Sequence, residues 1–139
     1  MGWDFDEIII GEPASAKNSR QIVSQGGKPR LIKSRKALGY TKLFDSQCPV
    51  LDPLILDDVF VVVDVWYASR RPDLACMDII MDLLQTKVYK NDRQVKATMS
   101  LWNLDRERPR VRVRVRRIES EDSTGMSSFS LSEIWGEKM

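Results

Sequence analysis

The sequence predicts an α+β domain in which helices pack on one face of a mixed β-sheet. Short β-branched runs such as Val59–Val63 favour strands, whereas apolar residues recur at helical spacing between Met77 and Leu84. Strands and helices do not alternate regularly along the chain, which argues against a purely parallel sheet. The 139-residue length suits a single domain.

The N-terminal third predicts a strand over Phe5–Gly11, ended by a turn at Gly-Glu-Pro. Two short extended segments, Arg20–Gln25 and Arg30–Lys33, flank a turn at a Gly-Gly pair. Ser34 is expected to cap a helix that runs to about Cys48 and ends before a proline.

The middle of the chain predicts a strand over Val59–Tyr67 that is buried on both faces, because its Val, Phe and Trp content is almost continuous. A helix follows over Met77–Leu84, and Gln94–Leu101 returns to an extended pattern. The polar segment Asn103–Pro109 predicts a hairpin connection into the next strand.

That next strand lies within the basic run Arg106–Arg117 and is termed the arginine strand. Its arginines at 110, 112, 114 and 116 alternate with valines. Period-two alternation predicts a half-buried strand with one wet face, on which guanidinium groups suit phosphate oxygens. The alternative is a solvated edge strand whose charges prevent aggregation.

Composition excludes several classes of protein. The sequence contains no histidine, which rules out His-based catalytic triads and His-ligated zinc. Two cysteines, Cys48 and Cys76, are too few for a four-thiolate site, and without an N-terminal signal peptide we expect a cytoplasmic protein. The longest apolar runs are far shorter than the about 20 residues that span a bilayer, so no membrane partner is expected.

The basic residues are unevenly distributed. Although the net charge is only +2, the segment from Pro13 to Phe44 holds eight basic residues and no acidic one. Several of them fall in the first turns of the helix after Ser34, where the helix dipole disfavours cations. A polyanionic partner explains this basic segment better than stability does.

Four aspartates lie within twenty residues, at Asp73, Asp78, Asp82 and Asp92. Oxygen ligands suit hard divalent cations, and metal-assisted cleavage of a phosphodiester needs at least two well-placed carboxylates. Carboxylates on a helix beside arginines are also common as surface ion pairs. Composition alone leaves both interpretations open.

The residues around these aspartates form a longer pattern, in the stretches Ser69–Ala75, Ile80–Gln85 and Val88–Val95. Together with Gly11–Ser19 and Ile32–Leu38, they resemble the RusA family of Holliday junction resolvases. The resemblance covers roughly Ile8 to Val115 and implies a RusA-like fold over residues 1–118. Residues 119–139 would then form an acidic, Ser-rich C-terminal tail.

The resemblance implies a homodimeric, Mg²⁺-dependent endonuclease, with Mn²⁺ as a possible substitute, that cuts four-way DNA junctions symmetrically. The family's acidic cluster consists of an Asp-Leu-Asp motif and a later aspartate. The motif's first Asp falls on Asp73, the later one on Asp92, and Asp82 matches a helical aspartate of the pattern. Its second Asp falls on Ala75, which fits either natural divergence or a deliberate substitution that traps a DNA complex.

The leading hypothesis is therefore a structure-selective junction endonuclease with catalytic positions Asp73, Ala75 and Asp92, impaired at Ala75 because magnesium tolerates few lost ligands. The alternative is a non-catalytic protein that binds junctions or other nucleic acids, and a weaker one is a scaffold for acidic partners. In either DNA-binding hypothesis, the expected contacts to four-way or branched DNA are Lys17, Arg20, Arg30, Lys33, Arg35, Lys36, Arg70, Arg71, Arg112 and Arg114.

Overall fold

The computed structural model describes residues 2–14 and 20–118. The described elements are β1 (Phe5–Ile10), β2 (Arg20–Gln25), β3 (Lys28–Lys33), α1 (Arg35–Gln47), β4 (Val59–Tyr67), α2 (Met77–Leu84), the 3₁₀ turn η2 (Asp92–Gln94), β5 (Val95–Leu104) and β6 (Arg110–Arg117). The α+β class is confirmed. In the described ranges, every helix is too short or too polar to span a bilayer.

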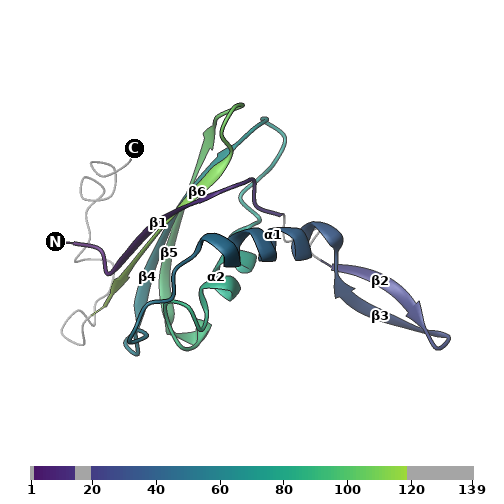
Figure 1. The fold of residues 1–139 in the computed structure, drawn as a ribbon, viewed down its shortest axis with the longest axis horizontal. Helices are drawn as coiled ribbons and strands as arrows, with labels where there is room; N and C mark the ends of the chain where they lie inside the picture. Colours follow the sequence, from purple (N-terminus) through teal and green to yellow (C-terminus); the bar gives the residue numbers. More distant parts are fainter. Residues whose placement is uncertain (1, 15–19, 119–139) are drawn as a thin grey trace.

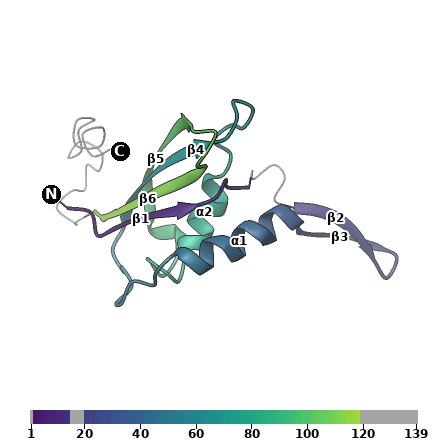
Figure 2. The same cartoon turned by 45° about the horizontal axis from the view of Figure 1, so that its top comes forward.

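A four-stranded sheet with the order β1-β6-β4-β5 forms the centre of the molecule (Figure 1). β4 runs parallel to β5 and antiparallel to β6, which in turn runs antiparallel to β1. α1 and α2 lie on the same face of this sheet (Figure 2). The predicted mixed sheet with helices on one face is therefore confirmed.

β4 is buried along its whole length, as the sequence predicts. Its odd-numbered valines, from Val59 to Val65, join the core beneath the helices, where they meet Phe44 and Ile80. Phe60 and Val62 point to the other face and pack against Trp3 and partly buried residues of β5. Each fully buried Val or Phe contributes about 1.5–3 kcal/mol, which makes β4 the main anchor of the fold.

α1 begins as the sequence predicts, with Ser34 as its N-cap. The Ser34 Oγ accepts the Ala37 amide at 3.2 Å, and Ala37, Tyr40 and Phe44 form the buried face. At the other end, the Cys48 amide donates to the Phe44 carbonyl at 2.8 Å. The hydrogen bonds define where α1 begins and ends, and Tyr40 and Phe44 pack into the core beneath the helix.

β2 and β3 form a separate two-stranded hairpin that projects beyond the N-terminal end of α1 (Figure 1). Its turn uses Gly26 and Gly27 at positive φ, a conformation that glycine adopts without strain. Both extended segments are confirmed, with β3 starting at Lys28. In the register, Arg20 stands opposite Lys33.

The predicted hairpin connection between the strand over Gln94–Leu101 and the arginine strand is wrong. β5 does cover that segment, but β4 lies between β5 and β6. The chain crosses from β4 through α2 into parallel β5, and it then returns to pair β6 with the opposite edge of β4. A strand buried on both faces needs hydrogen-bonding neighbours on both edges, and local alternation does not reveal which strand provides them.

The predicted wet face of the arginine strand is also wrong, as is the alternative of an edge strand. β6 is an interior strand, and the side chains of Arg114 and Asp64 are both fully buried in an ion pair of 2.9 Å. The Trp3 ring lies 5.0 Å from the Arg114 guanidinium carbon. Arg112 pairs with Asp6 at 2.7 Å and is only 11% exposed. Carboxylates of the protein itself therefore neutralise these two arginines.

Candidate nucleic-acid interface

A cavity of about 490 Å³ lies where the first turns of α1, the segment after β1 and the loop after β4 meet. Its charged lining consists of the cations of Arg35, Lys36 and Arg71 and the carboxylates of Glu12 and Asp73. We call it the α1 cavity. Three cations against two carboxylates leave the lining with a formal charge of +1, and all five residues are exposed.

Asp73 reaches this cavity because the loop after β4 is tied to the sheet. The Tyr67 hydroxyl donates to the Asp73 carbonyl at 2.7 Å, and Trp102 Nε1 donates to the Pro72 carbonyl at 2.9 Å. Within the loop, the Ala75 amide donates to Asp73 Oδ1 at 3.1 Å. The structure therefore brings positions 73 and 75 together, but only Asp73 contributes a carboxylate.

Glu12 is a cavity residue that the sequence analysis missed. The chain turns at Gly11, whose φ of +120° favours glycine and where a side chain would collide with Leu43. This turn carries Glu12 across to β4, where its Oε1 accepts the Ala68 amide at 2.9 Å. A signal was available, because Glu12 is the last acidic residue before the basic segment.

The first turn of α1 contributes concentrated positive charge. It holds no acidic residue, and both Arg35 and Lys36 are exposed. The unpaired amides at a helix N-terminus add a partial positive charge to the same place. Together they favour an anion at this end of the cavity.

Tyr40 lines the cavity and carries a hydroxyl that is itself buried. Its side chain is 4% exposed, and its hydroxyl has no hydrogen-bond partner within the described part of the chain. Burial raises the pKa of this hydroxyl far above its ordinary value. The nearby Cys76 and Cys48 thiols raise this pKa further, by smaller amounts. Tyr40 therefore remains a neutral hydrogen-bond donor at physiological pH.

The predicted aspartates do not converge. Asp92 and Asp78 line a second depression, of about 380 Å³, which does not include Asp73. Asp82 is exposed on α2. Over residues 2–14 and 20–118, no three carboxylates or thiols lie together as a metal-binding group. The structure therefore does not bring Asp73, Asp82 and Asp92 together as one metal-binding group.

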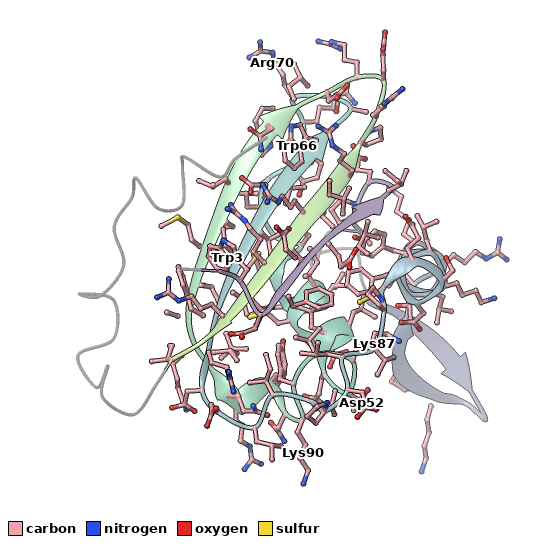
Figure 3. The ribbon with its side chains drawn as sticks, turned by 60° about the vertical axis from the view of Figure 1, so that its left-hand side comes forward. Trp3, Asp52, Trp66, Arg70, Lys87 and Lys90 are labelled. Carbon is pink, nitrogen blue, oxygen red and sulfur yellow. The ribbon has the colours of Figure 1, made fainter. Side chains whose placement is uncertain are left out.

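Topology explains this separation. Asp73 follows the end of β4, whereas Asp92 precedes the start of β5, and the two strands run parallel with Val59 opposite Val95. Figure 3 places Arg70 at one end of the sheet and Lys90 at the other. The sequence analysis correctly expected a helix between these two aspartates, but that helix does not bring them together.

The predicted DNA contacts divide into four groups. The first group is exposed: Arg35, Lys36 and Arg71 line the α1 cavity, and Arg70 precedes Arg71 in the chain. Arg112 and Arg114 are paired inside the protein, which removes them from the candidate interface. Lys17 lies outside the described residues, and the backbones of Arg20, Arg30 and Lys33 lie in the β2–β3 hairpin.

Comparison with known proteins gives no match to a family model or to a curated sequence.

Proposed function

We propose that this chain is a RusA-like protein that binds branched DNA, and four-way junctions in particular. The observation that carries the proposal is the convergence of Arg35, Lys36 and Arg71 on the α1 cavity. These cations come from a helix and from a loop after a distant strand, so folding, rather than sequence proximity, brings them together. Phosphate oxygens are the ligands that such a group of cations favours.

The β2–β3 hairpin supports a polyanionic partner. Arg20 stands opposite Lys33 in its register, and like charges at such positions destabilise a strand pair. A two-stranded hairpin is itself only marginally stable in water. A phosphate backbone beside the hairpin neutralises this repulsion, and the hairpin extends the interface beyond the α1 cavity.

Magnesium-dependent cleavage is the second candidate function, and Asp73 favours it because its carboxylate lies at the cavity that would receive a phosphate. Position 75, two residues along the same loop, carries no carboxylate. We propose that the chain in this form binds junctions and cuts them weakly or not at all.

A homodimer completes the proposal, because symmetric cleavage of a four-way junction needs two active sites related by a two-fold axis and closed two-fold dimers are the commonest oligomers. Both cysteines are unpaired and buried, in keeping with the proposed cytoplasmic location. Analytical ultracentrifugation should give about twice the 16.0 kDa chain mass. A monomer at micromolar concentration, with and without DNA, would contradict this part of the proposal.

Binding isotherms test the function directly. The full chain is titrated into a labelled four-way junction and into a linear duplex of matched length at several salt concentrations. We expect tighter binding to the junction and a steep loss of affinity with salt, because bound phosphates release counterions. Equal affinity for both DNAs, or affinity independent of salt, would refute junction recognition.

A further inference from the structure

The face of the sheet that points away from the helices has an apolar patch of its own. In the register, Phe60 and Val62 of β4 stand beside Ala97 and Met99 of β5, so the four side chains share this face. Phe60 and Val62 are fully buried. Five partly buried residues pack against them, namely Trp3, Ala97, Met99, Leu101 and Ile118. We call these seven residues the sheet patch.

The apolar surface extends beyond the sheet patch to the edge of the sheet. The register of β1, β6 and β4 puts Ile8 and Ile10 on the same face, where they are 48% and 54% exposed. Within the described ranges, α1 and α2 both lie on the other face, so neither helix covers the sheet patch (Figure 2). A contiguous apolar surface of this kind marks a contact site.

The chain leaves the described residues at this patch. Ile118 packs against Phe60 and Val62, and its amide donates to the Asp58 carbonyl at 2.7 Å. The C-terminal tail, residues 119–139, follows and lies outside the described residues. Its first eleven residues span at most about 36–40 Å when extended. A strand of ten residues such as β5 is about 33 Å long, so the end of the tail can reach any part of the patch.

The end of the tail has the sequence of a short amphipathic helix. Ser130 and Glu133 have the spacing of a capping box, and Phe129 and Ile134 have the spacing of a hydrophobic staple. A helix this short is unstable alone in water and needs an apolar surface to pack on. Its apolar residues at i, i+3 and i+4 would share one side: Leu131, Ile134 and Trp135.

Charge favours contact between the tail and the rest of the chain. The tail holds five acidic residues and one basic residue, so it carries −4 while the rest of the +2 chain carries +6. Arg112 and Arg114 lie on the same face as the patch and are already paired with carboxylates. This face therefore suits an apolar segment with acidic flanks better than it suits DNA.

We propose that the C-terminal tail folds back as a helix over the sheet patch, with Leu131, Ile134 and Trp135 against Met99 and Leu101. The tail covers the apolar face that the described helices leave bare. Its attachment at Ile118 gives it a millimolar effective concentration at the patch, which favours it over a separate molecule. This inference is independent of DNA binding.

Photocrosslinking locates the tail. The full chain with p-benzoylphenylalanine in place of Trp135 is unfolded together with an equal amount of its ¹⁵N-labelled form, refolded and irradiated without DNA. We expect position 135 to crosslink to peptides of β5 or to the peptide that holds Trp3, within one chain. Crosslinks between labelled and unlabelled chains would make a second copy the occupant and overturn the proposal. Crosslinks confined to other elements, or none, would refute it.

Two variants test which side of the tail helix packs. Ile134→Asp places a charge on the apolar side and should lower the melting temperature by about 4 °C or more. Ser132→Asp places the same charge on the opposite side of the first turn, where the helix dipole favours it, and should leave the melting temperature unchanged. In the crosslinking protein, only Ile134→Asp should reduce the yield several-fold. Equal effects of the two variants would contradict a packed apolar side.

A double-variant cycle tests the contact itself. Trp135→Ala and Leu101→Ala should each lower the melting temperature, and the double variant should lower it by less than the two separate losses together, because both remove the same contact. Leu56→Ala, at a position that is 74% exposed outside the patch, is the control and should add independently to Trp135→Ala. Additive losses for Trp135 and Leu101 would remove the tail from this part of the sheet.

Discussion

Arg114 and Asp64 form an ion pair in which neither side chain is exposed, with Arg114 Nη2 2.9 Å from Asp64 Oδ2. They lie on adjacent interior strands, β6 and β4. The Trp3 ring packs near the guanidinium group, 5.0 Å from its central carbon. A buried charge is tolerated when a close counter-charge accompanies it, so each residue depends on the other.

Arg114→Met should therefore lower the free energy of unfolding by about 3–5 kcal/mol, because it leaves the Asp64 carboxylate buried without its counter-charge. Urea titrations followed by circular dichroism measure this loss. The double variant Asp64→Leu/Arg114→Met should recover most of it, since both charges are then absent. Arg117→Gln, whose parent side chain is 55% exposed, is the control and should stay within about 0.5 kcal/mol of the parent. A loss below 1 kcal/mol for Arg114→Met alone would contradict the ion pair's role.

Salt dependence of DNA binding should separate the cavity cations from the arginine strand. Arg35→Gln should reduce the slope of log K against log salt by about one unit if its guanidinium contacts a phosphate. Arg112→Gln removes the same charge, but Arg112 is paired with Asp6 within the sheet. It should leave the slope unchanged. Equal slopes for Arg35→Gln and the parent protein would remove Arg35 from the interface.

The elements with strong local signals could be predicted from the sequence. Ser34 has the side chain that caps a helix, and the Gly26-Gly27 pair has the conformational freedom that its turn uses. β4 was predicted because continuous burial leaves a continuous apolar run. Each of these signals depends only on residues that are close in the sequence, so it can be recognised without knowledge of tertiary contacts.

The arginine strand and the candidate site show where such reasoning stops. The counter-charge of Arg112 is Asp6, which is 106 residues away in the sequence, so no local pattern indicates that this arginine is neutralised. Glu12 approaches the end of β4 through a similarly distant contact, 56 residues from Ala68. Positions 73 and 75 were predicted to share a site, and they lie together because they belong to one loop. Asp92 was predicted to join them, but a helix separates it from Asp73 in the chain and it lines a different depression.

Stability should fall in mildly alkaline solution because of Cys48. Burial, only partly offset by Lys87, raises the pKa of its thiol from 9.0 to about 11. The unfolded thiol ionises first, so this contribution to stability is complete below pH 9 and is lost as the pH rises towards 11. Urea titrations between pH 8 and 10 should show the decline, and Cys48→Ala should reduce it. An identical decline in both proteins would assign it to other groups.

We expect the proposed catalysis to depend on position 75. The Ala75 amide already donates to Asp73 Oδ1 at 3.1 Å, so Ala75→Asp adds a second carboxylate to the loop at the α1 cavity. We expect the parent chain to leave labelled junctions intact with Mg²⁺ or Mn²⁺ and the variant to cut them, as resolved on denaturing gels. Magnesium sites commonly use one or two carboxylates together with substrate phosphates, so two on one loop meet the minimum.

Further changes in the Ala75→Asp protein assign the carboxylates. Asp73→Asn should abolish cleavage, because it removes one of the two carboxylates on the loop. Asp92→Asn should matter less, since Asp92 lies beside Asp78 in the second depression, and Asp78→Asn is the matched control. Loss of cleavage with Asp92→Asn alone would mean that the two depressions act together on DNA. If Ala75→Asp cuts nothing with either ion, the nuclease interpretation is wrong and DNA binding remains; rapid cleavage by the parent chain would instead remove position 75 from the site.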